Sequence, residues 1–531
     1  MSKHGRAPVA LSLCLLTVAI LLTTYLASPT PVSAGALDQT ICESPAGLNG
    51  VWNPGLQSCT IPTGHTGNVT GTTIEVYEPQ AIVVSAGATL NVSSVLYLYG
   101  TGLYLNGTVN VLSGGTISAH GTALASGGAM VTGILNINAG GQYLLNGASL
   151  GGMLSVNPGG QVQNYGVIES FSPADLNING GVYNHGTLTV RGAAEVVVIG
   201  TLDNLSGGSI FVYGSLVRMP SGTLTNRDGA SIYLFKTAPG DVGRLSLSLG
   251  GEFTNAGYIE TNSNTVFDSD TAVTNDGSVV NRGEWQTDGK TTNGTAGVFH
   301  NYGTVLVGAG WENQGHVDGY GSWEFSVGNG ILNNYGTMSF SGSVTLRQHY
   351  SLQNRIGATM SLNGSLDAVQ GGGVLWNDGQ LDLGSGANVS LDSFSVMMNQ
   401  GICYQSGWVT TTAIIQNTGS YYLHCGAVIY RPAGPPLSFG APLIDLCVGT
   451  IRIIKSTAGG DGVFDYTAAG GGITPAFFIT ATAGSGVRDL TGLTANRWYT
   501  ITEALAPGWW LTGLTRERAL KARLVADVVV R

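Results

Sequence analysis

The chain has 531 residues, of which only 10% are charged, and it contains 82 glycines and carries a formal net charge of −10. Since ordinary globular domains have roughly 25% charged residues, few side chains here could form the solvent faces of helices, and the composition favours an all-β chain with many turns. Regular apolar triplets and 21 tyrosines argue against disorder, and the acidic balance argues against nucleic acid as a partner.

The first 34 residues have the pattern of an export signal. A basic start precedes an uncharged apolar stretch, residues 7–27, and the segment ends on Val32-Ser33-Ala34. This is the small-x-small pattern that signal peptidase accepts, although the apolar stretch is also long enough for an uncleaved membrane anchor. We expect a signal peptide over residues 1–34, and therefore a secreted protein in which disulfides can form.

Residues 35–63 contain two cysteines just before the repeats begin. Cys42 and Cys59 would close a short loop, and a disulfide there stabilises by on the order of 3 kcal/mol. Stacked strands leave open edges at the ends of a repeat array, and these edges invite association unless they are covered. The sequence therefore predicts a disulfide-bonded N-terminal cap.

Residues 64–430 repeat the motif Asn-x-Gly followed by a short alternating apolar run. Most repeats are 20 to 23 residues long, and no helical pattern separates the apolar runs. A fixed period of this kind indicates a solenoid, and alternation at period two indicates strands. We predict a right-handed parallel β-helix of roughly 16 to 18 coils. The motif begins at Asn164, Asn184, Asn204, Asn226, Asn255, Asn275, Asn301, Asn334, Asn354, Asn377 and Asn399.

The Asn-x-Gly motif is interpreted as a corner of the coil. Asparagine and glycine tolerate positive φ, which sharp turns require. Because coils stack at about 4.8 Å, an asparagine at the same corner of each coil would meet its counterparts above and below. Side-chain amides would then form a hydrogen-bonded ladder, so the motif is structural and not catalytic.

These coils resemble those of filamentous-haemagglutinin-type adhesins and other large bacterial surface proteins. The resemblance covers about two thirds of the chain and rests on the Asn-x-Gly-x-(Val/Ile/Leu) pattern. It implies a β-helical surface protein, but it does not specify a ligand.

Two further cysteines lie near the end of the repeats. Cys403 and Cys425 are 22 residues apart, which is one period. Residues one period apart on neighbouring strands lie within the Cα distance that a disulfide accepts, so we predict a bridge between them. The alternative is two buried free thiols, and Cys447 is expected to remain unpaired.

A Pro-rich linker, residues 431–443, separates the repeats from residues 444–531. The last segment alternates short strands with Gly-rich turns, which predicts a small β-sandwich. It resembles the prealbumin-like, collagen-adhesin B-type domains of bacterial surface proteins. Lys455 matches the end of their first strand, and Tyr499, Glu503 and Pro507-Gly508-Trp509 match a later strand. The tail after Leu514 departs from the family.

The resemblance also implies an internal isopeptide crosslink. In such domains the first-strand lysine bonds to an Asn or Asp of the last strand, helped by the glutamate of the later strand. Lys455 and Glu503 match two of these roles, and Asp527 is the candidate for the third. The alternative is a simple salt bridge between Lys455 and Glu503.

The acidic middle of the repeats contains candidate catalytic carboxylates. Parallel β-helices also include polysaccharide lyases and glycosidases, which need two carboxylates about 5 to 10 Å apart. Asp268 and Asp288 are one period apart, but solvated outward positions explain them as well. The acidic group comprises Asp268, Asp270, Asp276, Glu284, Asp288, Glu312, Asp318 and Glu324.

The same region contains Trp285, Trp311 and Trp323. Exposed on one face, they would form a carbohydrate-contact patch, whereas the alternative is that they fill the interior of a wide coil. No catalytic residues, metal site or cofactor are predicted. We expect a secreted bacterial surface protein, structural or adhesive, whose partners are a host or environmental surface, glycans included, and the cell envelope. The alternative is a β-helical polysaccharide lyase or glycosidase.

Overall fold

The computed structural model describes residues 35–99, 101–121, 128–147, 153–236, 242–248, 250–326, 330–347, 349–370, 372–425, 427–430, 438–439, 441, 443–445, 448–458, 460–470, 473–494, 499–504 and 507–509. The predicted signal peptide, most of the predicted linker, Cys447 and Asp527 lie outside these residues. In the described part of the chain, no helix is long and apolar enough to span a membrane. The chain divides into two compact units, Met1–Val273 and Thr274–Arg531.

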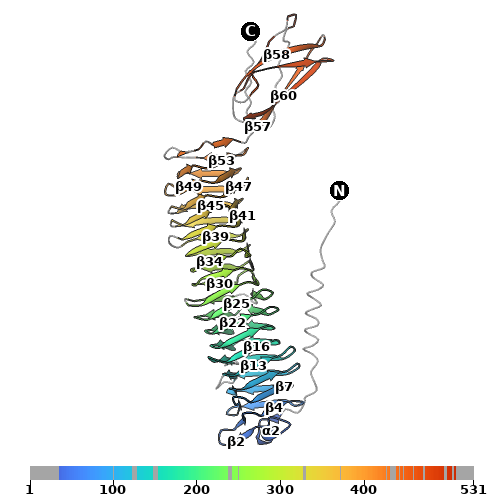
Figure 1. Cartoon of the computed structure of the whole chain (residues 1–531), viewed down its shortest axis with the longest axis vertical. Coiled ribbons are helices and arrows are strands. Elements are labelled where there is room, and N and C mark those ends of the chain that lie inside the picture. The colour runs from blue at the N-terminus through green and yellow to red at the C-terminus, as the bar shows by residue number, and fades with distance from the viewer. Residues whose placement is uncertain are drawn as a thin grey trace. The chain divides into compact units, whose positions relative to one another are not determined.

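The first unit is built from three parallel sheets, to which each coil contributes one strand apiece, as Figure 1 shows. Sheet A contains β5 (Ile74–Tyr77), β8 (Val95–Tyr99), β11 (Thr116–Gly121), β14 (Gln142–Gly147), β17 (Val167–Phe171), β20 (Thr187–Arg191), β23 (Ser209–Tyr213), β26 (Ser231–Phe235) and β29 (Tyr258–Thr261). Sheet B contains β3 (Ser58–Ile61), β6 (Ala81–Val84), β9 (Thr101–Leu105), β12 (Gly128–Val131), β15 (Met153–Val156), β18 (Asp175–Ile178), β21 (Glu195–Val198), β24 (Leu216–Met219), β27 (Arg244–Leu247) and β30 (Val266–Ser269). Sheet C contains β4 (Thr66–Val69), β7 (Thr89–Val92), β10 (Thr108–Val111), β13 (Ile134–Ile137), β16 (Gln161–Asn164), β19 (Gly181–Asn184), β22 (Thr201–Asn204), β25 (Thr223–Asn226) and β28 (Glu252–Asn255).

The coils of the second unit have the same three-sheet arrangement, and β31 (Val273–Asn275) lies at the boundary. Sheet A contains β32 (Ser278–Asn281), β35 (Val298–Asn301), β38 (His316–Gly319), β41 (Thr337–Phe340), β44 (Thr359–Leu362), β47 (Gln380–Leu383), β50 (Ile402–Gln405), β53 (Ser420–Leu423) and β56 (Leu443–Asp445). Sheet B contains β33 (Glu284–Thr287), β36 (Thr304–Val307), β39 (Ser322–Phe325), β42 (Ser343–Arg347), β45 (Ser365–Gln370), β48 (Asn388–Leu391), β51 (Trp408–Thr411) and β54 (Val428–Tyr430). Sheet C contains β34 (Lys290–Asn293), β37 (Gly310–Asn313), β40 (Ile331–Asn334), β43 (Ser351–Asn354), β46 (Val374–Asn377), β49 (Val396–Asn399), β52 (Ile414–Asn417) and β55 (Ser438–Phe439). The predicted parallel β-helix is confirmed.

The core of each coil follows from strict alternation along the strands. In β10, Val109 and Val111 are fully buried, whereas Thr108 and Asn110 point outward. Parallel pairing in register places Val109 against Leu90 of the preceding coil and Leu135 of the following one. Aliphatic side chains therefore stack in columns inside the coil, and each one contributes roughly 1.5–3 kcal/mol by leaving water.

The predicted asparagine ladder is confirmed in both units, except that Asn301 lies at the end of a sheet A strand, where it accepts a separate 2.8 Å bond from Asn281. Neighbouring asparagines at the ends of the sheet C strands are joined Nδ2 to Oδ1, as in the 2.6 Å bond from Asn164 to Asn184 and the 2.8 Å bond from Asn334 to Asn354. The rungs are 98–100% buried, and most also donate to a backbone carbonyl of the next coil. The first unit contains Asn164, Asn184, Asn204, Asn226 and Asn255; the second contains Asn275, Asn293, Asn313, Asn334, Asn354, Asn377, Asn399 and Asn417.

The glycine of the motif is required for a different reason from the one expected. Gly186 and Gly303 do not have positive φ. A Cβ on Gly186 would lie 2.1 Å from the carbonyl oxygen of Gly166, one coil away. The backbones come this close because the amides of His185 and Gly186 both donate to the carbonyl of Asn164 at 2.8 Å. Close approach of neighbouring coils, and not turn conformation, therefore selects glycine here.

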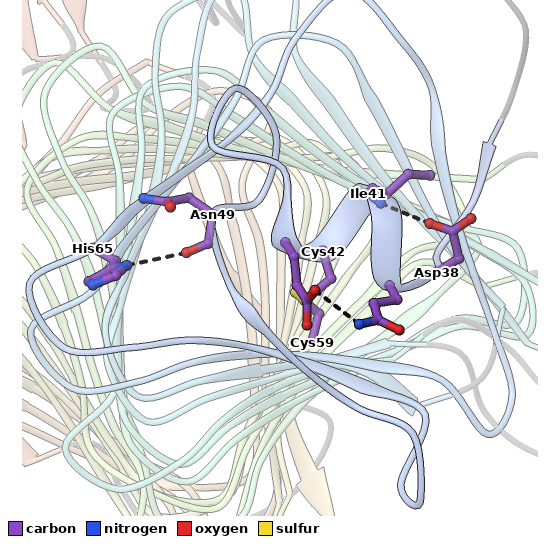
Figure 2. The surroundings of a disulfide bond; sticks show 8 residues. Asp38, Ile41, Cys42, Asn49, Cys59 and His65 are labelled. Atoms are coloured by element: carbon purple, nitrogen blue, oxygen red, sulfur yellow. Dashed lines mark hydrogen bonds between the residues drawn. A yellow bond between two sulfur atoms is a disulfide. The ribbon is translucent and has the colours of Figure 1, made fainter.

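The N-terminal cap is held by the predicted disulfide, shown in Figure 2. Cys42 lies on α2 (Gln39–Glu43) and bonds to Cys59 of β3, with the Cα atoms 5.5 Å apart and both cysteines fully buried. Strand β2 (Val51–Asn53) pairs antiparallel with β3, and β1 (Gly35–Ala36) pairs with β5. The amide of Asn68 in β4 donates to the Gly47 carbonyl at 2.6 Å, so the cap satisfies backbone groups at the open edge of the first coil.

The predicted Cys403–Cys425 bridge is wrong. Cys403 is a buried free thiol, and Cys425 is disulfide-bonded elsewhere. The reason is the register: Cys403 in β50 pairs with Tyr421 in β53, only 18 residues along, so Cys425 lies four residues beyond the stacked position. Burial raises the pKa of the Cys403 thiol, which keeps it protonated.

A peptide map without reduction tests this arrangement. We expect one linked pair joining the Cys42 and Cys59 peptides, and a Cys403 peptide that alkylates only after denaturation. The Cys425 peptide should be linked to the Cys447 peptide, because Cys14 leaves with the expected signal peptide and no other cysteine of the sequence remains. A Cys403–Cys425 pair would instead contradict the pairing of Cys403 with Tyr421 and support stacking of residues 22 apart.

The C-terminal part of the second unit is a separate pair of antiparallel sheets. Strand β57 (Val448–Ser456) pairs with β60 (Ser485–Thr494), and β58 (Gly462–Ala469) lies between β59 (Ala476–Ala481) and β61 (Thr500–Ala504). Alternate residues of these strands form a small apolar core, to which Phe464, Tyr466, Phe477, Ile479, Leu490 and Tyr499 contribute. The predicted β-sandwich is confirmed.

Candidate functional site

The three tryptophans of the expected carbohydrate-contact patch are buried. Trp285, Trp311 and Trp323 are each 1% exposed and fill the interior of the coils. Their rings lie 5.2, 5.1 and 5.7 Å from the ring of Phe299, mostly edge to face. They occupy inward positions of the alternation, so the expected filling of a wide coil is confirmed, and the carbohydrate-contact patch is wrong because the rings cannot contact a sugar outside the coil.

Several carboxylates of the acidic region are engaged in ion pairs or hydrogen bonds. Glu312 accepts from Lys290 at 2.7 Å, and this bond is the main reason that the pKa of Glu312 is lowered. A shallow hollow of the second unit is lined by Thr295, Glu312, Gln314 and Tyr335. The carboxylate in this hollow, Glu312, is the one that already pairs with Lys290. Similar pairs join Asp268 to Arg244 and Glu324 to Arg347.

Asp318 lies between two imidazoles on the outer face of sheet A in the second unit. His300 Nδ1 and His316 Nε2 lie 3.0 and 2.9 Å from the same carboxylate oxygen, Oδ2. The other ring nitrogen of His316 lies 2.7 Å from the Thr337 hydroxyl. Asp268 and Asp288, the pair considered for glycoside cleavage, belong to different units. Of the acidic group, Asp268, Glu312, Asp318 and Glu324 thus lie within ion-pair distance of a basic or imidazole side chain.

The outer face of sheet A in the first unit carries aromatic side chains that the sequence analysis did not single out. The N-terminal aromatic cluster consists of Tyr77 in β5, Tyr97 and Tyr99 in β8, and His120 in β11. Tyr77, Tyr99 and His120 share one register position in successive coils. Their rings stack at 5.0 and 5.1 Å, and Tyr97 lies 5.9 Å from Tyr99 on the same strand.

Polar groups surround this cluster. The Tyr77 hydroxyl donates to Glu75 at 2.7 Å, and chiefly this bond raises the pKa of Tyr77 to about 12. The Ser118 hydroxyl lies 2.8 Å from Nε2 of His120 and accepts from the Asn146 amide at 3.1 Å. Burial lowers the pKa of His120, so the imidazole is neutral at physiological pH. The cluster thus combines aromatic surface with hydroxyl, amide and carboxylate groups, and it carries no lysine or arginine.

A second group of rings lies further along the same sheet. The central aromatic cluster consists of Phe211 and Tyr213 in β23, and Tyr233 and Phe235 in β26. Phe211 stacks on Tyr233 at 5.1 Å, and Tyr213 stacks on Phe235 at 4.9 Å. Arg191 lies 4.5 Å from the Tyr213 ring and pairs with a carboxylate of the preceding coil, so this cluster, unlike the first, has a cation beside it.

Alternation in the sequence could have revealed both clusters. In the run Leu96-Tyr97-Leu98-Tyr99, leucine occupies the inward positions, so both tyrosines must face outward. The same reasoning places Phe211 and Tyr213 outside the coil. The predicted site residues were tryptophans and carboxylates, and no side of the coil was predicted for these tyrosines and phenylalanines.

In the C-terminal domain, Lys455 and Glu503 form a nearly buried ion pair. Nζ of Lys455 lies 2.5 Å from Oε1 of Glu503, and both side chains are nearly buried, at 12% and 14% exposure. The Lys455 ammonium also lies 4.4 Å from the centre of the Phe464 ring. Tyr466 pairs with Glu503 in register across β58 and β61, and burial raises its pKa.

The C-terminal domain has a recognisable family. Residues 451–520 match the family model of the prealbumin-like fold domain. Among solved structures, a TibC-catalysed, hyper-glycosylated fragment of TibA shares 16% identity and a TM-score of 0.24, covering 72% of this chain and 99% of the fragment. A likeness this distant carries no functional argument. No curated protein sequence matches the chain.

Proposed function

We propose that the protein is a secreted bacterial cell-surface protein with a structural or adhesive function. The β-helical coils would form a stalk that carries the prealbumin-like domain, and the protein would act by contact and not by turnover. The observation that supports this most is the prealbumin-like domain itself, which follows coils locked together by buried asparagines. The resemblance of such domains to parts of bacterial surface proteins provides the functional link.

The internal construction of the coils suits a load-bearing element. Each asparagine rung is satisfied by a neighbour in the next coil and often by a backbone carbonyl as well. Fully satisfied buried polar networks rigidify a structure and specify one arrangement. The partners proposed are a host or environmental surface and the cell envelope.

Deleting the gene in the producing bacterium tests the function. We expect the deletion strain to adhere less to host cells or to abiotic and polysaccharide-coated surfaces, and expression of the full chain to restore adhesion. As a control, the purified chain should release no reducing ends from a panel of polysaccharides. Unchanged adhesion, together with depolymerisation of any polysaccharide, would instead support the lyase or glycosidase alternative.

We further expect an isopeptide crosslink in the prealbumin-like domain. The amine of Lys455, deprotonated through Glu503, would attack the side-chain carboxyl carbon of Asp527, form the amide and release one water. The nearly buried contact between Lys455 and Glu503 supports the first two roles, and Asp527 lies outside the described residues.

Intact-mass spectrometry of the reduced chain tests the crosslink. Its mass should be one water below the value calculated from the sequence, and replacing Lys455 with arginine or Glu503 with alanine should abolish the difference. If the unaltered chain has its full calculated mass, Lys455 and Glu503 form only a salt bridge.

A further inference from the structure

We propose that the N-terminal aromatic cluster on β5, β8 and β11 binds a neutral, extended polysaccharide that runs across the strands of sheet A. This inference rests on the proposed function, because it names the class of surface ligand that an adhesive stalk would contact. The proposed binding face consists of this cluster, Tyr77, Tyr97, Tyr99 and His120, together with Glu75 and Asn146 on the same outer face of one sheet.

The spacing of the side chains suits a polymer with a short repeat. Tyr77, Tyr99 and His120 lie at the same position in three successive coils, and neighbouring strands are about 4.8 Å apart. A sugar residue in an extended β-linked chain has a similar length. A polysaccharide lying along the stack would therefore present one sugar to each row of side chains, and several weak contacts would add together.

The chemistry of the cluster suits hydroxyl-rich ligands. Sugars have apolar C–H surfaces and hydroxyl groups that both donate and accept hydrogen bonds. The tyrosine rings present apolar edges with hydroxyl tips, while Glu75 accepts hydrogen bonds and the Asn146 amide both donates and accepts. Because Tyr99 is stacked between two rings, its faces are occupied, and contact is expected through ring edges and hydroxyls. Tyr77, at the end of the stack, is 43% exposed.

The charge of the cluster selects against anionic polymers. Glu75 is negative, His120 is neutral because burial lowers its pKa, and the remaining members are uncharged. An acidic polysaccharide would find no cation here and would be repelled by the carboxylate. The central aromatic cluster has similarly stacked rings, but Arg191 lies over one of them. It therefore serves as a control for stacking alone.

Affinity electrophoresis of the full secreted chain tests the proposal. The gels contain hydroxyethyl cellulose, xylan or glucomannan as neutral probes, and polygalacturonate as the anionic probe. The variants are Tyr99→Ala and Glu75→Gln in the cluster, and Tyr213→Ala as the control that removes an equivalent stacked ring. Thermal midpoints of all variants show whether each one folds.

We expect at least one neutral glycan to retard the chain and the Tyr213→Ala variant equally. Tyr99→Ala and Glu75→Gln should bind about tenfold more weakly or not at all. The proposal is overturned if no neutral glycan retards the chain, if only polygalacturonate does, or if the cluster variants bind as well as the control. In those cases the stack only stabilises the coils. If labelling of intact cells still detects the protein at the surface, the ligand is wrong but the proposed function stands.

Discussion

Replacing Asn334 with alanine should destabilise the coils by about 2–4 kcal/mol, because it leaves buried groups unsatisfied on both sides. Asn334 accepts from Asn313 at 2.7 Å and donates to Asn354 and to the Thr359 carbonyl, at 2.8 and 2.9 Å. Water cannot replace these bonds, because Asn334 is completely buried. Thermal denaturation followed by circular dichroism should show a lower midpoint.

Asn363→Ala is the matched control. Asn363 also precedes a glycine at a coil corner, but its side chain is exposed and donates to Ser361 at 3.1 Å. This variant should change stability by less than about 0.5 kcal/mol. If the two variants have the same midpoint, the ladder does not stabilise the stack.

Replacing Gly303 with alanine should be at least as damaging. The new Cβ would lie 2.0 Å from the carbonyl oxygen of Gly283, and moving the two backbones apart would disturb the bond from Asn281 to Asn301. The amide of Gly303 also donates to the Asn281 carbonyl at 3.1 Å, so separating the coils breaks this bond. We expect a loss of about 3 kcal/mol or more, or a failure to fold, measured as soluble yield and thermal midpoint.

Gly55→Ala is the control for this change. A Cβ there would meet Asn53 Oδ1 at 3.5 Å, an ordinary contact, in the hairpin of the cap. Its yield and midpoint should stay near those of the unaltered chain. A stable, fully soluble Gly303→Ala variant would contradict the close approach of the coils.

The asparagine ladder could be predicted because it depends only on residue type and a repeating position. The partner of Cys403 could not, since ladder partners are separated by 18 residues in one coil and 29 in another. Turns of different length absorb that difference while the strands stay in register. A sequence interval of 22 therefore did not identify the partner of Cys403.

The side on which a residue lies could be predicted only where alternation was followed residue by residue. Trp285 lies between Glu284 and Gln286, and this pattern places it inward, where a wide coil needs a large side chain. Attention to residue type alone suggested a surface patch. For Gly186 the sequence correctly indicated a constrained backbone, but the constraint is a carbonyl of the neighbouring coil, which depends on how coils stack.

The account is tested most directly by labelling intact producing cells with antibodies against the purified chain. We expect strong surface labelling that is lost when protease is added outside the cells and is absent from the deletion strain. Labelling that appears only after the envelope is permeabilised would show that the chain is not displayed, and it would contradict a surface structural or adhesive function.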